Sequence, residues 1–215
     1  KIATVPMADP GRAVLAHLAE RGLYHWFGPQ RFGRGGDNLR QGHALLAGGR
    51  RPRGRRQLRL LVSAVQSALF NDYLLRRLAD GPLDRVLPGE ICQTVPRGGV
   101  FRCDDVNEVG TRLAAGEVRL TGPLHGPKMR PAAEGRPAAL EDEGLAAHGL
   151  TRDAFRPLKK VAPGGRRPLT VRPEDPGVTP AEPQGLWVSF TLPAGAYATV
   201  VVREITRTAF ADLRG

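Results

Sequence analysis

Residues 24–38, YHWFGPQRFGRGGDN, combine four glycines, two arginines and Gln30 with four aromatic side chains. Glycine lets a backbone approach a ligand closely, arginine binds phosphate through a planar fork of donors, and aromatic faces stack on unpaired bases. This composition predicts a loop that binds a nucleotide drawn out of its helix. A glycine-rich surface loop with two core aromatic residues is the alternative, and composition alone leaves the two equally open.

The segments on both sides of this stretch predict helices. Within residues 9–22, Asp9 is a suitable N-cap, Pro10 fits the first turn of the expected helix, and Gly22 ends that helix. Residues 39–48 predict a second, short helix.

A run of five arginines without any acidic residue follows at 47–57, AGGRRPRGRRQ. Such a run is typical of a solvated basic linker. That interpretation is favoured over a dedicated RNA contact, although the two are compatible. Residues 58–79 then have apolar side chains at helical spacing and predict the longest helix of the chain.

The remaining segments mix short strands with helices. Apolar clusters separated by turns predict strands within 86–95, 98–103 and 116–124, and alternation predicts a strand at 186–192. A further strand is expected at 166–173, and 173–185 is expected to be a turn or a loose connector. Helical pieces are expected near 106–115, at 138–150 and at 151–161. A terminal helix is expected at 198–205, and for this last segment a strand is the alternative. The fold class is therefore α+β.

The chain is strongly basic, with 32 lysines and arginines against 21 acidic residues and a net charge of +11. A basic surplus raises affinity for polyanions such as RNA. A GC-rich genome also enriches arginine, which outnumbers lysine 28 to 4. Genome composition explains the choice of arginine over lysine, but by itself it does not explain the excess over acidic residues.

No pattern of a metal site or membrane span is present in the sequence. Cys92 and Cys103 match no zinc spacing, and two buried thiols in a reducing compartment are expected. No apolar run approaches the length of about 18 residues that suggests a membrane span. No signal peptide is visible.

Four segments resemble the tRNA pseudouridine synthase D (TruD) family. The first is Phe27-Gly28-x-Gln30-Arg31-Phe32-Gly33 with Gly36-x-Asn38. The second is 190–204, FTLPAGAYATVVVRE, in which Ala196 replaces the usual serine. Weaker matches occur at 63–71 and at 121–129, followed by 166–173. All stand in the order of the family and together span most of the chain.

The resemblance implies a pseudouridine-synthase catalytic domain with mixed and antiparallel strands, interrupted by a smaller inserted α/β TRUD domain. Residues 1–50 and 172–215 would belong to the catalytic domain and 51–171 to the insertion. The two signature segments would then converge on one cleft.

The implied activity is isomerisation of a uridine in tRNA, at position 13, to pseudouridine. The implied enzyme is cytoplasmic, needs no cofactor or metal, does not bind membranes, and is a monomer at full length. The family's catalytic aspartate lies in an upstream Gly-x-Lys-Asp motif, and this sequence contains no Lys-Asp dipeptide. We therefore assign no catalytic residue and expect the chain, similar to the C-terminal part of the family, to be inactive alone. A non-catalytic basic RNA-binding module is the alternative.

The resemblance also implies site residues. Phe27 would stack on the flipped uracil, and His25, in place of the family's asparagine, would contact base or ribose. Tyr197 would close the far wall. Gln30 and Arg31 would orient the loop or contact the RNA backbone, with Gly28, Gly33 and Asn38 completing the predicted site. Phe32 is expected in the core, and Arg203 and Glu204 are expected to form an ion pair.

Overall fold

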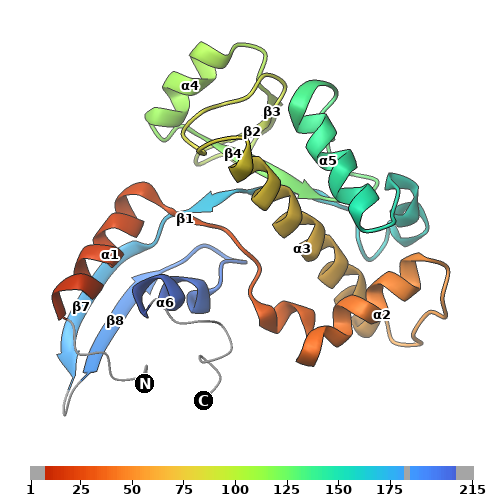
Figure 1. Ribbon diagram of the computed structural model, residues 1–215, viewed down its shortest axis with the longest axis horizontal. Coiled ribbons are helices and arrows are strands. Elements are labelled where there is room, and N and C mark those ends of the chain that lie inside the picture. The colour runs from red at the N-terminus through yellow and green to blue at the C-terminus, as the bar shows by residue number, and fades with distance from the viewer. Residues whose placement is uncertain (1–7, 182–184, 207–215) are drawn as a thin grey trace. The chain divides into compact units, whose positions relative to one another are not determined.

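The computed structural model describes residues 8–181 and 185–206. The chain forms two compact units. The first unit combines the segment up to Gly28 with the segment from Thr170 onward, and the second unit is Pro29–Leu169. Both contain helices and small antiparallel sheets (Figure 1), so the predicted α+β class is confirmed.

The first unit is built from two segments that are far apart in sequence. Its elements are α1 (Ala8–Arg21), β1 (Leu23–Tyr24), β6 (Thr170–Val171), β7 (Glu174–Ala181), β8 (Gly185–Thr191) and α6 (Ala198–Thr206). Strand β1 pairs antiparallel with β6, Leu23 opposite Val171, which joins the two segments. Buried Leu15 and Leu18 of α1 share a core with Val201 of α6, so the helices close over the paired strands.

The expected C-terminal end of the first helix is confirmed, whereas α1 begins at Ala8, so Asp9 lies inside the helix and is not its N-cap. Gly22 ends α1 with φ 82° and donates its N–H to the carbonyl of Leu18 at 2.8 Å. The side chain of Asp9, the expected N-cap, lies outside the described part of the chain. The terminal segment is helical, as α6, rather than the alternative strand.

Strand β7 corrects the expectation of a turn or loose connector at 173–185, of which 182–184 lie outside the described residues. It pairs with β8 from Glu174 opposite Thr191 to Ala181 opposite Gly185, with a register shift before Gly177. The segment's prolines suggested a break in structure. Proline is tolerated at bulges and on edge strands, and β8 is the only described neighbour of β7.

The second unit is a four-stranded antiparallel sheet surrounded by helices. Its elements are η1 (Pro29–Phe32), η2 (Arg34–Gly36), α2 (Asp37–Leu46), α3 (Arg55–Ala79), β2 (Ile91–Thr94), β3 (Val100–Arg102), α4 (Val106–Ala114), β4 (Val118–Leu124), α5 (Gly135–Ala147), η3 (Arg152–Leu158) and β5 (Gly165–Pro168). The strand order is β3-β2-β4-β5. The predicted helices and strands are found with small shifts, but the expected strand at 166–173 divides at Leu169 into β5 and β6.

Helix α3 is the centre of the second unit, where it packs against α2, α5 and β4. A Cβ on Gly42 of α2 would lie 2.4 Å from the carbonyl oxygen of Leu61. A Cβ on Gly122 of β4 would lie 2.9 Å from the ring of Phe70. Glycine at both positions therefore lets two neighbours approach the same helix closely.

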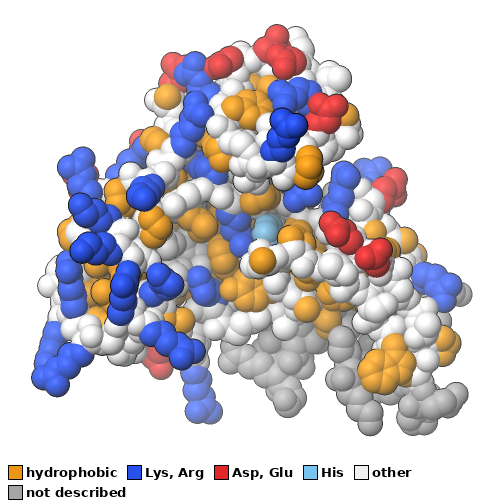
Figure 2. All heavy atoms as spheres, turned by 180° about the vertical axis from the view of Figure 1, so that it is seen from behind, with side chains coloured by type: hydrophobic (Ala, Val, Ile, Leu, Met, Phe, Trp, Pro, Cys, Tyr) orange, Lys and Arg blue, Asp and Glu red, His pale blue; other side chains and the backbone are white. Residues whose placement is uncertain are grey.

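Basic side chains gather on one surface of the second unit. Figure 2 shows lysine and arginine side chains grouped at the lower left, over α2, the start of α3 and η3. The segment 50–56 lies there and its arginines are exposed, as expected for a solvated basic run. Helix α3 begins within the run, at Arg55, so only its first part is a linker.

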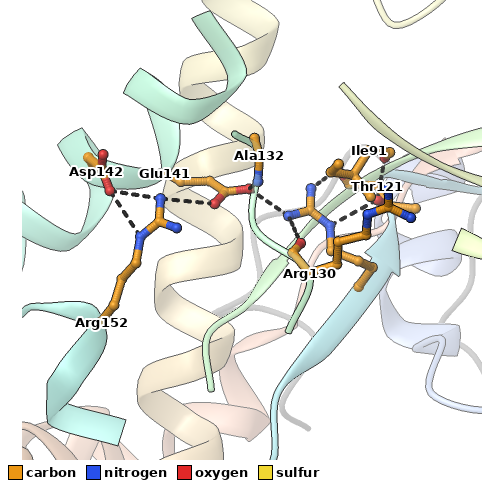
Figure 3. Close-up of polar contacts among 8 residues, drawn as sticks. Ile91, Thr121, Arg130, Ala132, Glu141, Asp142 and Arg152 are labelled. Carbon is orange, nitrogen blue, oxygen red and sulfur yellow. Dashed lines mark hydrogen bonds and ion pairs between the residues drawn. The ribbon is translucent and has the colours of Figure 1, made fainter. Parts of the chain in front are cut away.

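A buried polar cluster holds α5 against the sheet (Figure 3). The carboxylate of Glu141 accepts hydrogen bonds from Nη1 of Arg166 at 2.6 Å and from the backbone N–H of Ala132 at 3.1 Å. Arg152 Nη2 lies 3.4 Å from it. Arg166 also donates to Thr121 of β4, through Nη2 to the carbonyl at 2.8 Å. One arginine therefore links β4, β5 and α5.

Candidate functional site

The predicted site begins on a short segment that strand pairing fixes in the first unit. Tyr24 lies opposite Thr170, and the chain then runs through His25 and Phe27 to Gly28. His25 is 6% exposed and Phe27 is 7% exposed. Both side chains are therefore buried.

Phe27 and Tyr197 meet in the first unit. Their ring centroids are 5.9 Å apart and their planes are inclined by 67°, an edge-to-face arrangement that aromatic pairs favour. Tyr197 stands immediately before α6, whose Val200 and Val201 are buried, and this packing fixes its position. The structure thus brings together one residue from each of the two signature segments.

Arg31 is anchored within the second unit. Its Nε donates to Oγ of Ser67 on α3 at 3.1 Å, and this hydroxyl donates to the carbonyl of Ser63 at 2.7 Å. Ser67 is 1% exposed. The arginine is therefore oriented by α3, while Gln30 beside it is exposed.

Gly33 and Asn38 form a tight contact in the same unit. Gly33 has φ +80°, and a Cβ there would lie 2.8 Å from Cγ and 3.0 Å from the backbone nitrogen of Asn38. Both backbone conformation and space therefore require glycine at this position. Gly35 also has positive φ, +57°, but a Cβ there would meet open space.

The eight predicted site residues have side chains suited to binding a nucleotide, and none of them is a carboxylate that could act as a nucleophile. They offer two aromatic rings, an imidazole, two amides, one guanidinium and two glycines, but no carboxylate. Asp37, the acidic residue of this stretch, is paired with Arg40. These groups can stack on a base, donate to phosphate and exchange hydrogen bonds.

Sequence reasoning missed Ser67. It lies in the weaker resemblance at 63–71, but nothing there indicated that its hydroxyl would orient Arg31. A serine on the buried face of a helix was the available signal, because a buried hydroxyl needs a hydrogen-bond partner.

Residues 8–181 and 185–206 contain no group of three or more His, Cys, Asp or Glu placed to hold a metal ion. Cys92 and Cys103 are free and buried, as expected. Burial raises the pKa of Cys92 to about 12, so its thiol stays protonated at neutral pH. None of the described helices is both long and apolar enough to cross a membrane.

Known proteins are similar to this chain over most of its length. A family model described as tRNA pseudouridine synthase D (TruD) matches residues 53–205. The tRNA pseudouridine synthase D of Thermus thermophilus is 43% identical over 201 residues, 93% of this chain and 54% of that protein. Its counterpart in Aeromonas hydrophila is 35% identical over 213 residues, 99% of this chain and 59% of that protein. The chain thus spans between half and three fifths of these relatives.

A solved structure shares the fold. A crystal structure described as a tRNA pseudouridine synthase D of Methanosarcina mazei superposes with a TM-score of 0.73 over 92% of this chain and 64% of that one. At 20% identity, this similarity concerns the fold alone.

Proposed function

Because the chain belongs to the tRNA pseudouridine synthase D family, we propose that it supplies part of an enzyme that converts a uridine of tRNA, at position 13, to pseudouridine. The meeting of Phe27 and Tyr197, 5.9 Å apart, supports this most directly. Each residue lies in a different signature segment, and nothing in the core of a generic α+β protein requires that the two segments meet.

In this reaction the C1′–N1 bond of the uridine breaks, the uracil rotates, and a C1′–C5 bond forms. The C5 proton is lost and N1 gains a proton, so the product is an isomer. The target base must first leave its stack at a cost of a few kcal/mol. Stacking and phosphate contacts offset this cost.

The residues of this chain would bind and orient the substrate. Phe27 would offer its ring to the uracil while Tyr197 supports it edge-on, and His25 would contact the base or ribose. Arg31, oriented by Ser67, would hold the loop or a phosphate. Gln30 is exposed and would contact the backbone of the RNA.

Residues 1–50 and 172–215 would belong to the catalytic domain and 51–171 to the insertion, in a cytoplasmic enzyme that is monomeric at full length. The nucleophile is not among the site residues, and the sequence contains no Lys-Asp dipeptide. We therefore propose that the 215-residue chain alone makes no pseudouridine. The same observation supports the second candidate, a non-catalytic RNA-binding module.

The test is incubation of the purified chain with an unmodified tRNA transcript, followed by carbodiimide-stop mapping of pseudouridine. We expect no product from the chain alone, and product at one uridine when the chain is joined to a segment that carries the Gly-x-Lys-Asp motif. Site-specific product from the chain alone would show that an aspartate within it is the nucleophile. RNA binding without product in the joined protein would favour the non-catalytic module.

A further inference from the structure

The net positive charge of the chain comes from the second unit. Residues 29–169 contain 25 lysines and arginines and 14 acidic residues, which gives the whole net charge of +11. The rest of the chain contains 7 of each and is neutral. A GC-rich genome would enrich arginine in both units, so base composition does not explain this division.

Within the second unit the charge is concentrated further. Residues 38–71 contain seven arginines and no aspartate or glutamate. Arg55 Nη2 donates to the carbonyl of Lys160 at 3.3 Å, which brings the end of η3 to the start of α3. We define the arginine patch as the exposed residues Arg50, Arg51, Arg53, Arg55, Arg56, Arg59, Lys159 and Lys160 (Figure 2).

The arginine patch has no acidic partners in the described part of the chain. Its side chains form none of the ion pairs found among the described residues. The acidic residue of η3, Asp153, is already paired with Arg156 at 2.8 Å. The patch is therefore a surface of uncompensated positive charge.

This arrangement is unfavourable for the fold itself. Like charges close together repel each other, and cations in the first turn of a helix oppose the helix dipole. Arg55 and Arg56 stand in the first turn of α3, whose first turn contains no acidic residue. A polyanion bound over the patch would remove this repulsion, whereas the folded chain alone does not.

We propose that the arginine patch binds the phosphodiester backbone of RNA, as a second contact surface built from residues other than those of the candidate site. This inference rests on the proposed function, whose substrate is RNA. The patch contains no aromatic side chain, so it offers nothing on which an unpaired base would stack. Guanidinium groups contact phosphate oxygens without reading sequence. The patch therefore fits the RNA backbone and not a particular base.

The test compares two triple variants of the full chain that remove equal charge. R50A/R51A/R53A changes loop arginines of the patch that make no described contact. R85A/R97A/K128A changes three exposed cations elsewhere in the second unit. Affinity is measured by fluorescence anisotropy across several salt concentrations, for a labelled tRNA transcript and for an oligoadenylate that contains no uridine. Thermal melting confirms that both variants fold.

We expect the patch variant to lose about tenfold or more in affinity at moderate salt. Its log–log salt slope should flatten by about 2 to 3, since each lost phosphate contact contributes about 0.7–0.9. In the control variant both the affinity and the salt slope should change much less than in the patch variant. This difference between the two variants should be the same for both RNAs. Equal losses in the two variants, or tighter binding of the chain to phosphatidylserine vesicles than to either RNA, would overturn the proposal.

The two proposals fail separately. If the patch difference is seen with both RNAs but no form of the protein makes pseudouridine, the patch stands and the proposed reaction is wrong. If pseudouridine forms while the patch variant keeps the salt slope of the unmodified chain, the reaction stands and the patch is not an RNA contact.

Discussion

The edge of one aromatic ring meets the face of another where Phe27 and Tyr197 lie 5.9 Å apart, although the whole second unit separates them in the sequence. Such a pair is worth about 0.5–1.5 kcal/mol beyond the burial of its area. Because Phe27 lies in one signature segment and Tyr197 in the other, a substitution in either segment can remove this contact.

Tyr197→Ala is expected to destabilise the first unit, and Tyr197→Phe to leave it nearly unchanged. The first variant removes the ring beside Phe27, whereas the second keeps the ring and removes only the hydroxyl. Since 1 kcal/mol corresponds to about 2–4 °C in a chain of this size, melting followed by circular dichroism resolves the difference. Equal melting temperatures for the two variants would mean that the ring contact contributes nothing.

Phe27→Ala is expected to weaken binding of a tRNA transcript by about 1–3 kcal/mol, the cost of losing one stacked base. The loss should be the same at every salt concentration, because no charge is removed. This separates it from the arginine variants. Unchanged affinity together with a lower melting temperature would mean that buried Phe27 contributes to stability alone, and would remove it from the site.

Gly33→Ala is expected to be more destabilising than Gly35→Ala. Both glycines have positive φ, so alanine carries a backbone penalty of about 1–2 kcal/mol at either position. A Cβ on Gly33 would also lie within 3.0 Å of Asn38, while a Cβ on Gly35 meets open space. Urea denaturation of the two variants compares them directly, and a larger loss for Gly35→Ala would contradict the described contact.

Glu141→Ala is expected to lower the unfolding free energy by about 3–5 kcal/mol, the cost of leaving a buried charge without its partner. Arg166 would lose its carboxylate at 2.6 Å while its side chain stays 2% exposed. The matched control is Asp153→Asn in the exposed pair with Arg156, which should cost less than about 1 kcal/mol. Comparable losses in the two variants would show that water reaches Glu141.

The stability of the chain is expected to fall as pH decreases below about 6.5, the usual pKa of histidine. Burial, with the charges of Arg152 and Arg166, lowers the pKa of His125 to about 3, partly offset by Asp142. The unfolded chain therefore takes up a proton at a pH where folded His125 stays neutral, which favours unfolding by at most about 1.4 kcal/mol per pH unit. Above about pH 6.5, His125 is neutral in both the folded and the unfolded chain, so its protonation no longer affects stability.

Denaturation at pH 7.5 and pH 5 measures this loss. His125→Leu should reduce the difference between the two pH values, and His17→Gln, on the exposed face of α1, should not. An unchanged difference in the His125→Leu variant would assign the pH dependence to other groups.

Local sequence patterns predicted the helices and strands that have a clear apolar periodicity of their own. Helix α3 shows apolar spacing from Leu58 onward, and β8 alternates exposed Trp187 and Ser189 with half-buried neighbours. Strand β7 was missed because its prolines are acceptable only beside one partner strand and a bulge, and pairing is a property of two segments. The division at Leu169 was missed for the same reason, since β5 and β6 pair with different strands.

The features of the candidate site likewise include some that the local sequence predicts and others that it does not. The need for glycine at position 33 follows from the sequence pattern and is consistent with its backbone. The hydrogen bond from Arg31 to Ser67 and the contact of Phe27 with Tyr197 join distant segments. No local pattern specifies such pairs, so only the resemblance pointed to the second of them.

The pairing of Leu23 with Val171 also sets an order of events during synthesis. The ribosome must add the entire second unit before β1 can find its partner, which takes about 7–30 s at about 5–20 residues per second. The second unit, continuous in sequence, can fold during that interval. We therefore expect residues before the second unit to remain unpaired and accessible to chaperones during this interval. Folding of the second unit then brings β1 and β6, which flank it in the sequence, close enough to pair.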